Sequence, residues 1–354
     1  MPAPVAAHGR GWYGRAMQPA PPAEPAPWWR RGILNGVLLG GLALAAIALL
    51  NYQEMPGLTR ILADLPLAVA ISAAVHIPQI FFTALAWRAL LPPDNRPSIG
   101  TMMLLRWYRE AANALLPAGA IIGQAAAARL LARTGVPGNM AGATATVDIT
   151  LEAVSQLFFT LAGVALLVVG SGSAGGGLAG FALAGLGIAL AGAAAMVLVQ
   201  RSLPLAVIER LLARLSRRWP SINPGAIRDF QAAILALHAN WSRLAAAMLF
   251  HTTSWVLGAL EIAGVLWLLG YPVSLADALV IEALAQALRN VGFLLPGALA
   301  VQEGAIIGAA ALVGVPPAAA LAVALVRRSR EVVFSIPGLL AWQRAEVRAT
   351  RPST

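Results

Sequence analysis

The sequence contains no cysteine and no lysine, and it has few charged residues of either sign. Without cysteine it can form neither disulfide bonds nor thiolate metal sites. Only 11% of the 354 residues are charged and 59% are hydrophobic, whereas an average soluble domain is about 25% charged. Too few polar residues remain to cover a water-facing surface, which excludes a soluble enzyme and a disordered scaffold. The sequence is therefore that of an integral membrane protein.

Hydrophobic runs near the length needed to cross a bilayer, about 20 residues, occur six times. They cover residues 33–50, 65–91, 141–169, 178–199, 244–269 and 318–342. A cleaved signal peptide is the alternative for the first run. That run is followed by Asn51-Tyr52-Gln53 and not by a small-residue cleavage site, so we expect six uncleaved spans.

The basic residues indicate the orientation of these spans. All 25 are arginine, and with 15 acidic residues they give a net charge of +10. If the N-terminus is cytoplasmic, the arginines between the spans fall on the inner side, and only Arg60 falls outside. The positive-inside rule then predicts that both termini are cytoplasmic. Six arginines lie instead within hydrophobic sequence: Arg106, Arg109, Arg289, Arg327, Arg328 and Arg330.

We expect one membrane domain over residues 32–346, flanked by short cytoplasmic tails. The tail over residues 1–31 is rich in proline, alanine and glycine without periodicity, which is typical of disorder. A second tail covers residues 347–354. The basic linker over residues 200–243 has leucines at helical spacing, so it is either a helix lying on the anionic inner leaflet or a plain connecting helix.

Two further hydrophobic segments reveal an internal repeat. A Leu-Leu-Pro that ends at Pro117 matches one that ends at Pro296, and a Gly-Val-Pro that ends at Pro137 matches one that ends at Pro316. Both matches have the same offset of 179 residues, from 117 to 296 and from 137 to 316. We place the repeat halves at about residues 101–199 and 280–346.

Three predicted spans separate the two copies, so the second copy is inverted relative to the first. The proline-broken segments are then expected to be re-entrant hairpins. One, over residues 102–134, enters from the cytoplasm, and the other, over residues 276–313, enters from outside. The expected fold is an all-α integral membrane protein of about six transmembrane helices plus two re-entrant hairpins in an inverted repeat. Broken helices at matching positions of two inverted halves are typical of transporters with a site near the bilayer midplane.

Polar residues inside the hydrophobic sequence mark this site. Each ionised group near the bilayer centre costs about 2.5–3.5 kcal/mol, so several together need partners or a solvated path. Asp148 and Glu152 lie on one polar stripe of the third span, and their repeat-equivalent positions in the sixth span hold Arg327 and Glu331. The predicted substrate path combines these spans with both hairpins: Asn113, Pro117, Gln124, Arg129, Asp148, Glu152, Arg289, Asn290, Pro296, Gln302, Glu303, Arg327, Arg328 and Glu331.

A structural role is the alternative for these charges. They could be buried ion pairs that fix helix register, with Arg327 paired to Glu331 four residues later. Because repeat mates near a two-fold axis lie close together, we expect Asp148 to pair with Arg327, and Arg129 is the alternative partner of Asp148. The four histidines are scattered, so we expect no metal site and no cofactor. His76 precedes Pro78, which predicts a kink in the second span.

Several motifs carry a family resemblance: Asn113-Ala-Leu-Leu-Pro117, Phe293-Leu-Leu-Pro296-Gly297-Ala298, Val301-Gln302-Glu303-Gly304 and Pro337-Gly-Leu-Leu-Ala-Trp342-Gln343. Over residues 33–346 the chain resembles the hopanoid-biosynthesis-associated membrane proteins of the HpnL type. These belong to the group named for the transmembrane region of lysylphosphatidylglycerol synthase. Gln124 departs from the pattern, because an acidic residue is expected there.

The resemblance implies a lipid flippase or lipid transporter linked to hopanoids. The expected partners are membrane lipids, either a hopanoid or an anionic phospholipid, and hopanoid-pathway enzymes; we expect no nucleic acid. Only 12 residues follow Trp342, so we expect the soluble aminoacyl-transfer domain of the full synthases to be absent and the chain not to be an enzyme. Two alternatives stay open. One is a membrane enzyme that acts on a lipid head group, with Glu303 or Glu282 as acid and base. The other is a non-catalytic scaffold for hopanoid-modifying enzymes.

Overall fold

The computed structural model of the chain describes residues 58–116, 119–170, 224–291 and 301–350, and the single positions 194 and 198. Over these ranges all regular structure is helical, which confirms the all-α prediction. The predicted first span and the tails over residues 1–31 and 351–354 lie outside the described residues. So do nearly all of the predicted fourth span, residues 200–223 of the linker, Pro117 and Pro296.

The longest helices coincide with apolar sequence, and the helices that begin at Gly138 and Pro317 each follow a Gly-Val-Pro motif, whereas Pro66, Pro78 and Pro337 lie inside helices. In chain order they are α2 (Leu58–Leu90), the short 3-10 helix η2 (Pro93–Asn95), α3 (Ile99–Leu115), α4 (Gly119–Ala132), α5 (Gly138–Gly170), α8 (Pro224–Ala239), α9 (Trp241–Leu268), α10 (Leu275–Val291), α11 (Val301–Leu312) and α12 (Pro317–Thr350). The predicted hairpins therefore consist of the helix pairs α3–α4 and α10–α11.

Within the part of the chain that the structure describes, three helices are long and apolar enough to cross a membrane: Ala63–Leu90, Gly138–Gly170 and Trp241–Leu268. They coincide with the predicted second, third and fifth spans. α12 covers the predicted sixth span but carries several charges. α9 also has an exposed tryptophan at each end, Trp241 at 77% and Trp267 at 70% exposure. At about 1.5 Å per residue these lie about 39 Å apart, which matches a bilayer with its head groups and the usual interfacial position of tryptophan.

The helices repeat along the chain at the predicted offset. α5 begins at Gly138 and α12 at Pro317, which are 179 residues apart. α3 and α4 correspond in the same way to α10 and α11, and α2 corresponds to α9, each within a few residues. Gly135 and Gly314, which precede α5 and α12, are mates and share a left-handed backbone, with φ of 99° and 77°. The repeated unit is therefore four helices and includes α2 and α9, so it is wider than the predicted halves.

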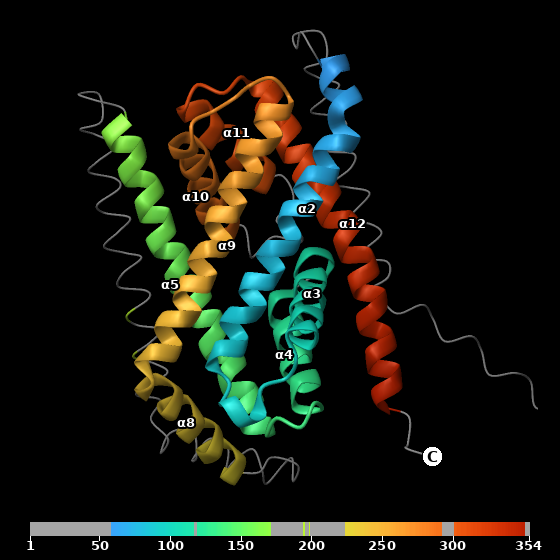
Figure 1. Cartoon of the computed structure of the whole chain (residues 1–354), viewed down its shortest axis with the longest axis vertical. Helices are drawn as coiled ribbons and strands as arrows, with labels where there is room; N and C mark the ends of the chain where they lie inside the picture. Colours follow the sequence, from blue (N-terminus) through green and yellow to red (C-terminus); the bar gives the residue numbers. More distant parts are fainter. Residues whose placement is uncertain are drawn as a thin grey trace, which may run out of the picture.

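The contacts between helices follow the same correspondence between the two sets of helices. α5 packs against α10, and their mates α12 and α3 pack against each other; α2 and α9 pack together. In Figure 1, α2 and α12 run downward along the chain, whereas their mates α9 and α5 run upward. The helix pair α3–α4 lies in the lower half of this view and α10–α11 in the upper half. These directions are the ones expected of an inverted repeat, which stays a prediction together with six spans and re-entrant hairpins in a bilayer.

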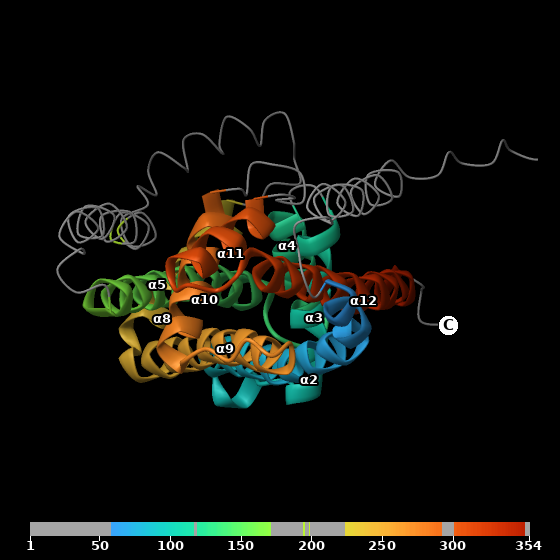
Figure 2. The same cartoon turned by 90° about the horizontal axis from the view of Figure 1, so that it is seen from above.

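Small residues allow the two halves to approach closely. A Cβ added at Gly163 of α5 would lie 2.4 Å from Ala283 Cβ of α10, and one added at Gly338 of α12 would lie 2.9 Å from Ala111 Cβ of α3. Seen from above, α2 and α9 lie along one side of the molecule, and α4 and α11 lie on the opposite side (Figure 2).

Two apolar cores lie mainly within one half each. One is built mostly from α9–α12 and includes Ile281 and Ile306. The other joins α2–α5 and includes Trp87 and Met102. Two smaller apolar clusters connect the halves, one between α2, α5, α8 and α9 and one between α5, α9 and α10.

Candidate functional site

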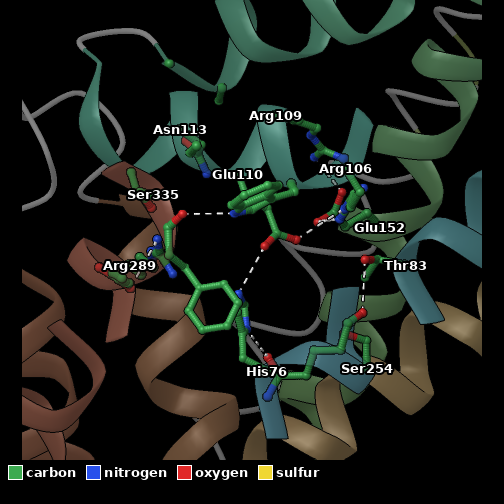
Figure 3. Close-up of a pocket in the computed structure, with 18 of the residues that line it drawn as sticks. His76, Thr83, Arg106, Arg109, Glu110, Asn113, Glu152, Ser254, Arg289 and Ser335 are labelled. Atoms are coloured by element: carbon green, nitrogen blue, oxygen red, sulfur yellow. Dashed lines mark hydrogen bonds and ion pairs between the residues drawn. The ribbon is translucent and has the colours of Figure 1, made fainter. Parts of the chain in front are cut away.

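A cavity of about 460 Å³ lies where the two halves meet. Its lining comes from α2, α3, α4 and α5 of the first half and from α9, α10 and α12 of the second. Figure 3 shows side chains from several of these helices turned toward this space. The ionisable residues that line it are His76, Arg106, Arg109, Glu110, Glu152, Glu282, Arg289, Arg327, Arg328, Arg330 and Glu331.

An ion-pair network in the first half joins α3 to α5. Arg106 is 2% exposed, and its guanidinium lies 3.1 Å from Asp148 Oδ2 and 2.6 Å from Glu152 Oε1. Arg109 lies 2.6 Å from Glu152 Oε2 and 3.4 Å from Asp148 Oδ2. Arg106 and Arg109 are three residues apart, so they lie on one face of α3, and Asp148 and Glu152 share a face of α5 in the same way. Two helical stripes of opposite charge therefore meet.

A buried histidine completes this network from the second half. His251 of α9 lies with Nε2 3.0 Å from Asp148 Oδ1, and both side chains are fully buried. Asp148 thus has three partners in Arg106, Arg109 and His251. The predicted pairing of Asp148 with Arg327 is wrong, because these three groups already surround the carboxylate.

A second network, in the other half, is centred on Arg327. Its Nη2 lies 2.6 Å from Glu282 Oε2 of α10, and it donates to the Gly258 carbonyl oxygen at 3.1 Å. Its Nε lies 3.6 Å from Glu261 Oε1 of α9. Arg330 lies 3.5 Å from the other oxygen of Glu261. Arg327 therefore pairs with α9 and α10, and the alternative pairing with Glu331 is also wrong.

Neutral donors from α2 complete the environment of Glu261. The Ser72 hydroxyl donates to its Oε1 at 2.6 Å, and Gln79 Nε2 donates to its Oε2 at 3.0 Å. Since α2 belongs to the first half and α9 to the second, this carboxylate joins the halves. A carboxylate that is 1% exposed is tolerated only with such partners.

Arg328 connects α12 to α11. It lies 2.5 Å from Glu303 Oε1 and 3.1 Å from Glu331 Oε2. Gln302 donates to Glu331 Oε1 at 2.9 Å. Arg289 of α10 lies 3.7 Å from the same oxygen, which is beyond hydrogen-bond distance. Glu331 is thus held by α11 and α12, and Arg289 contacts it only loosely.

His76 is the main polar link across the cavity. Its Nε2 lies 3.2 Å from Glu110 Oε2 of α3, and its Nδ1 is hydrogen-bonded to Arg330 of α12. Its ring packs edge-to-face on Phe334 at 5.2 Å, and Trp107 donates to the Phe334 carbonyl oxygen at 2.9 Å. The sequence predicted only a kink near His76. The structure shows that His76 also joins the two halves through its contacts with Glu110 and Arg330.

The cavity contains some of the predicted path residues. Asn113, Glu152, Arg289, Arg327, Arg328 and Glu331 line it directly. Asp148, Gln302 and Glu303 stand behind that lining as partners of these residues and their neighbours. The side chain of Asn290, like Pro117 and Pro296, lies outside the described residues.

Two predicted path residues lie elsewhere. Arg129 is 57% exposed and pairs with Glu346 at 2.5 Å, away from the cavity lining. Gln124 is buried and donates to the Ala145 carbonyl oxygen at 2.6 Å, where it joins α4 to α5. Arg129 and Gln124 therefore connect helices to one another and do not line the cavity.

Glu261, Gln79 and the contact of His251 with Asp148 were not predicted from the sequence. Glu261 is a lone acidic residue within an otherwise apolar span. Such a group is expensive in hydrocarbon unless it is paired, so that isolation was the available signal. Nothing in the sequence pattern identifies Gln79 or Ser72 as its partners.

The cavity is nearly balanced in charge. Six arginines and seven carboxylates belong to it and its supporting networks: Arg106, Arg109, Arg289, Arg327, Arg328 and Arg330 with Glu110, Asp148, Glu152, Glu261, Glu282, Glu303 and Glu331. Among the described residues, no group of three His, Cys, Asp or Glu is suited to hold a metal ion. The arrangement can bind a polar or charged group through hydrogen bonds and ion pairs.

Comparison with known proteins gives one match. The sequence model of the family described as "Lysylphosphatidylglycerol synthase TM region" matches residues 33–338. No curated protein and no solved structure matches the chain. The match begins at the start of the predicted first span and extends into α12, so it includes all the helices that line the cavity.

Proposed function

Because the chain belongs to the family of the lysylphosphatidylglycerol synthase transmembrane region, a membrane family linked to lipid metabolism or transport, we propose that it is a lipid flippase. It would move a polar lipid head group across the bacterial inner membrane through the cavity between its halves. The hopanoid link comes only from the resemblance of its motifs to HpnL-type proteins. In this proposal the chain is a transporter and not an enzyme.

The observation that carries this proposal is the position of the cavity. It lies between two copies of one four-helix unit that run in opposite directions, and a polar site between inverted halves is typical of transporters. A head group that crosses bare hydrocarbon loses its hydrogen bonds, at a cost of several kcal/mol per polar group. A polar cavity replaces those hydrogen bonds, while the acyl chains stay in lipid.

The described arginines outside the cavity support one orientation. Arg60 lies near the start of α2, at one end of the molecule, whereas most of these arginines gather toward the other end, which holds η2 and α8, at the bottom of Figure 1. This set comprises Arg88, Arg96, Arg129, Arg133, Arg228, Arg243 and Arg344. By the positive-inside rule that end faces the cytoplasm. The helix pair α3–α4 would then approach from the cytoplasm and α10–α11 from outside, as alternating gates.

A vesicle assay tests the proposal. The purified chain is reconstituted with lipids that carry a fluorophore on one acyl chain, and dithionite added outside quenches the label of the outer leaflet. A flippase makes the inner-leaflet label accessible on the timescale of minutes. Arg289→Gln should slow this step about tenfold or more, because it removes a lining residue that has no close ion pair among the described residues, while Arg129→Gln is the control outside the cavity.

Three outcomes separate the alternatives. Label movement no faster than in protein-free vesicles, across a panel that includes a hopanoid, would refute the flippase. Chemical conversion of the lipid without any transbilayer movement would indicate a membrane enzyme. Normal movement in every cavity variant that folds would mean that the buried charges only support the fold, and a scaffold would then be favoured.

A further inference from the structure

The two halves present opposite charges to the cavity at equivalent positions. Among the charged side chains that line it, Glu110 of α3 and Arg289 of α10 are the most exposed, each at 30%. They are 179 residues apart, so they are repeat mates. Figure 3 shows both side chains in the same cavity, on different helices. At this pair of positions the first half presents a negative wall and the second half a positive wall, although both halves also contribute residues of the other sign to the lining.

A second pair of mates strengthens this polarity. Trp107 and Gln286 also line the cavity and are again 179 residues apart. Each precedes the charged residue of its helix by three positions, so it shares that residue's helix face. The indole of Trp107 is held by its hydrogen bond to the Phe334 carbonyl oxygen at 2.9 Å. One wall therefore combines an aromatic ring with a carboxylate, and the other combines an amide with a guanidinium.

These combinations suit two different ligand groups. A carboxylate beside an indole attracts an ammonium, through ion pairing and the cation–π interaction. A guanidinium beside an amide attracts a phosphate, through charge-assisted hydrogen bonds. Either wall alone would be weak evidence for a ligand group. The evidence is stronger because equivalent positions of α3 and α10 provide the two walls.

Within the described part of the chain, Arg289 is also the partly exposed lining arginine that lacks a close partner. Arg106, Arg327 and Arg328 each lie 2.5–2.6 Å from a carboxylate oxygen, and Arg330 is only 8% exposed and is hydrogen-bonded to His76. The carboxylate contact of Arg289 is 3.7 Å, to Glu331, which is too long for a hydrogen bond. A phosphate that binds Arg289 therefore does not have to break a close ion pair.

We infer that the cavity binds a zwitterionic phospholipid head group, with its phosphate at Gln286 and Arg289 and its ammonium at Trp107 and Glu110. This inference rests on the proposed transport function and names its substrate class. It differs from the anionic phospholipid expected from the sequence. An anionic head group would bring no ammonium to Glu110 and Trp107, and a cationic group without phosphate would leave Arg289 unused.

The test measures head-group selectivity in vesicles of phosphatidylglycerol. Three labelled lipids share one fluorescent acyl chain: phosphatidylethanolamine, its N-acetyl derivative and phosphatidylglycerol. The N-acetyl derivative keeps the phosphate and removes only the ammonium. The wild-type chain should move phosphatidylethanolamine about tenfold faster than the other two lipids, which corresponds to about 1.4 kcal/mol. Replacing half of the host lipid with unlabelled phosphatidylethanolamine should slow it by competition, and unlabelled N-acetyl derivative should not.

Two variants separate the walls. Glu110→Gln should lower the rate for phosphatidylethanolamine about tenfold and bring it close to the rate for the N-acetyl derivative. Arg289→Gln should lower the rates of all three lipids, because all carry a phosphate. Glu346→Gln and Arg129→Gln remove the partners of an ion pair outside the cavity lining and are the matched controls.

The outcomes distinguish this inference from the proposed function. If phosphatidylglycerol or the N-acetyl derivative moves as fast as phosphatidylethanolamine in the wild-type chain, the substrate class is wrong and the transporter stands. Equal losses for all three lipids in Glu110→Gln would overturn the ammonium site. If no lipid moves, both the substrate class and the transport function are refuted. The wild-type comparison decides the matter even if a variant does not fold.

Discussion

The pair formed by Arg327 and Glu282 should be one of the strongest couplings in the protein. Arg327 is 5% exposed and Glu282 is 2% exposed, and their closest atoms are 2.6 Å apart. Arg327→Met keeps most of the side-chain volume and removes the charge. Gln286 Nε2 also donates to Glu282, at 2.9 Å, and among the described residues this hydrogen bond would be the one that Glu282 keeps. Breaking a buried pair in this way costs about 3–5 kcal/mol.

The loss of unfolding free energy should come mainly from the unpaired Glu282 carboxylate. Glu261, the other carboxylate near Arg327, keeps Arg330, Ser72 and Gln79. Neutralising the stranded group with Glu282→Gln should therefore recover part of the stability. The double variant should be more stable than the sum of the two single losses predicts, by about 1–3 kcal/mol.

A double-mutant cycle in mixed detergent micelles measures this coupling as free energies of unfolding. The matched cycle combines Arg327→Met with Asp148→Asn. Asp148 and Arg327 share no partner, because Asp148 is bound by Arg106, Arg109 and His251. Their effects should add within about 0.5 kcal/mol. Additive losses for Glu282 and Arg327, or a coupling above about 1 kcal/mol for Asp148 and Arg327, would refute the assignment of the two networks.

Three shorter predictions concern glycines. A Cβ at Gly258 would lie 2.5 Å from Glu282 Oε1, so Gly258→Ala should lower the unfolding free energy by about 1–3 kcal/mol in the same micelle assay; Gly308→Ala, where a Cβ meets nothing within 4 Å, should not. Gly135→Ala and Gly314→Ala should each lower the unfolding free energy by about 1–2 kcal/mol, because both positions have a positive φ that is unfavourable for alanine. A gain in stability at either position would contradict the left-handed backbone. Finally, since the chain lacks cysteine, single cysteines at Gly135 and Gly314 should react with an impermeant maleimide only from the cytoplasm and only from outside, respectively, and labelling of both from one side would refute the inverted orientation.

The sequence predicted the parts of the fold that depend on local signals. The apolar runs at residues 65–91, 141–169 and 244–269 became helices long enough to cross a membrane. The Gly-Val-Pro motifs and their offset predicted that α5 and α12 would begin at equivalent positions. The repeat of α2 and α9 was not visible, because these helices share no motif and only their length, order and packing correspond.

Ion-pair partners were much harder to predict than the charged residues themselves. Two-fold symmetry suggested that Asp148 should meet its mate Arg327. Asp148 and Arg327 could meet only if both lay at the two-fold axis, and the sequence does not give the distance of a side chain from that axis. The actual partners come from other helices, His251 of α9 for Asp148 and Glu282 of α10 for Arg327. Tertiary packing determines which residues become ion-pair partners, and the spacing of residues within one helix does not predict that packing.

The paired charges around the cavity also have an electrical consequence. Moving one elementary charge through a membrane potential involves about 2.3 kcal/mol per 100 mV. The buried arginines described above each lie close to a carboxylate, as Arg106 does to Glu152 and Arg328 to Glu303. If the halves rock, these groups travel as neutral pairs and carry little gating charge. The inward-facing and outward-facing states would then keep nearly the same balance in an energised cell as in a depolarised one, and voltage could drive transport only through the charge of the cargo.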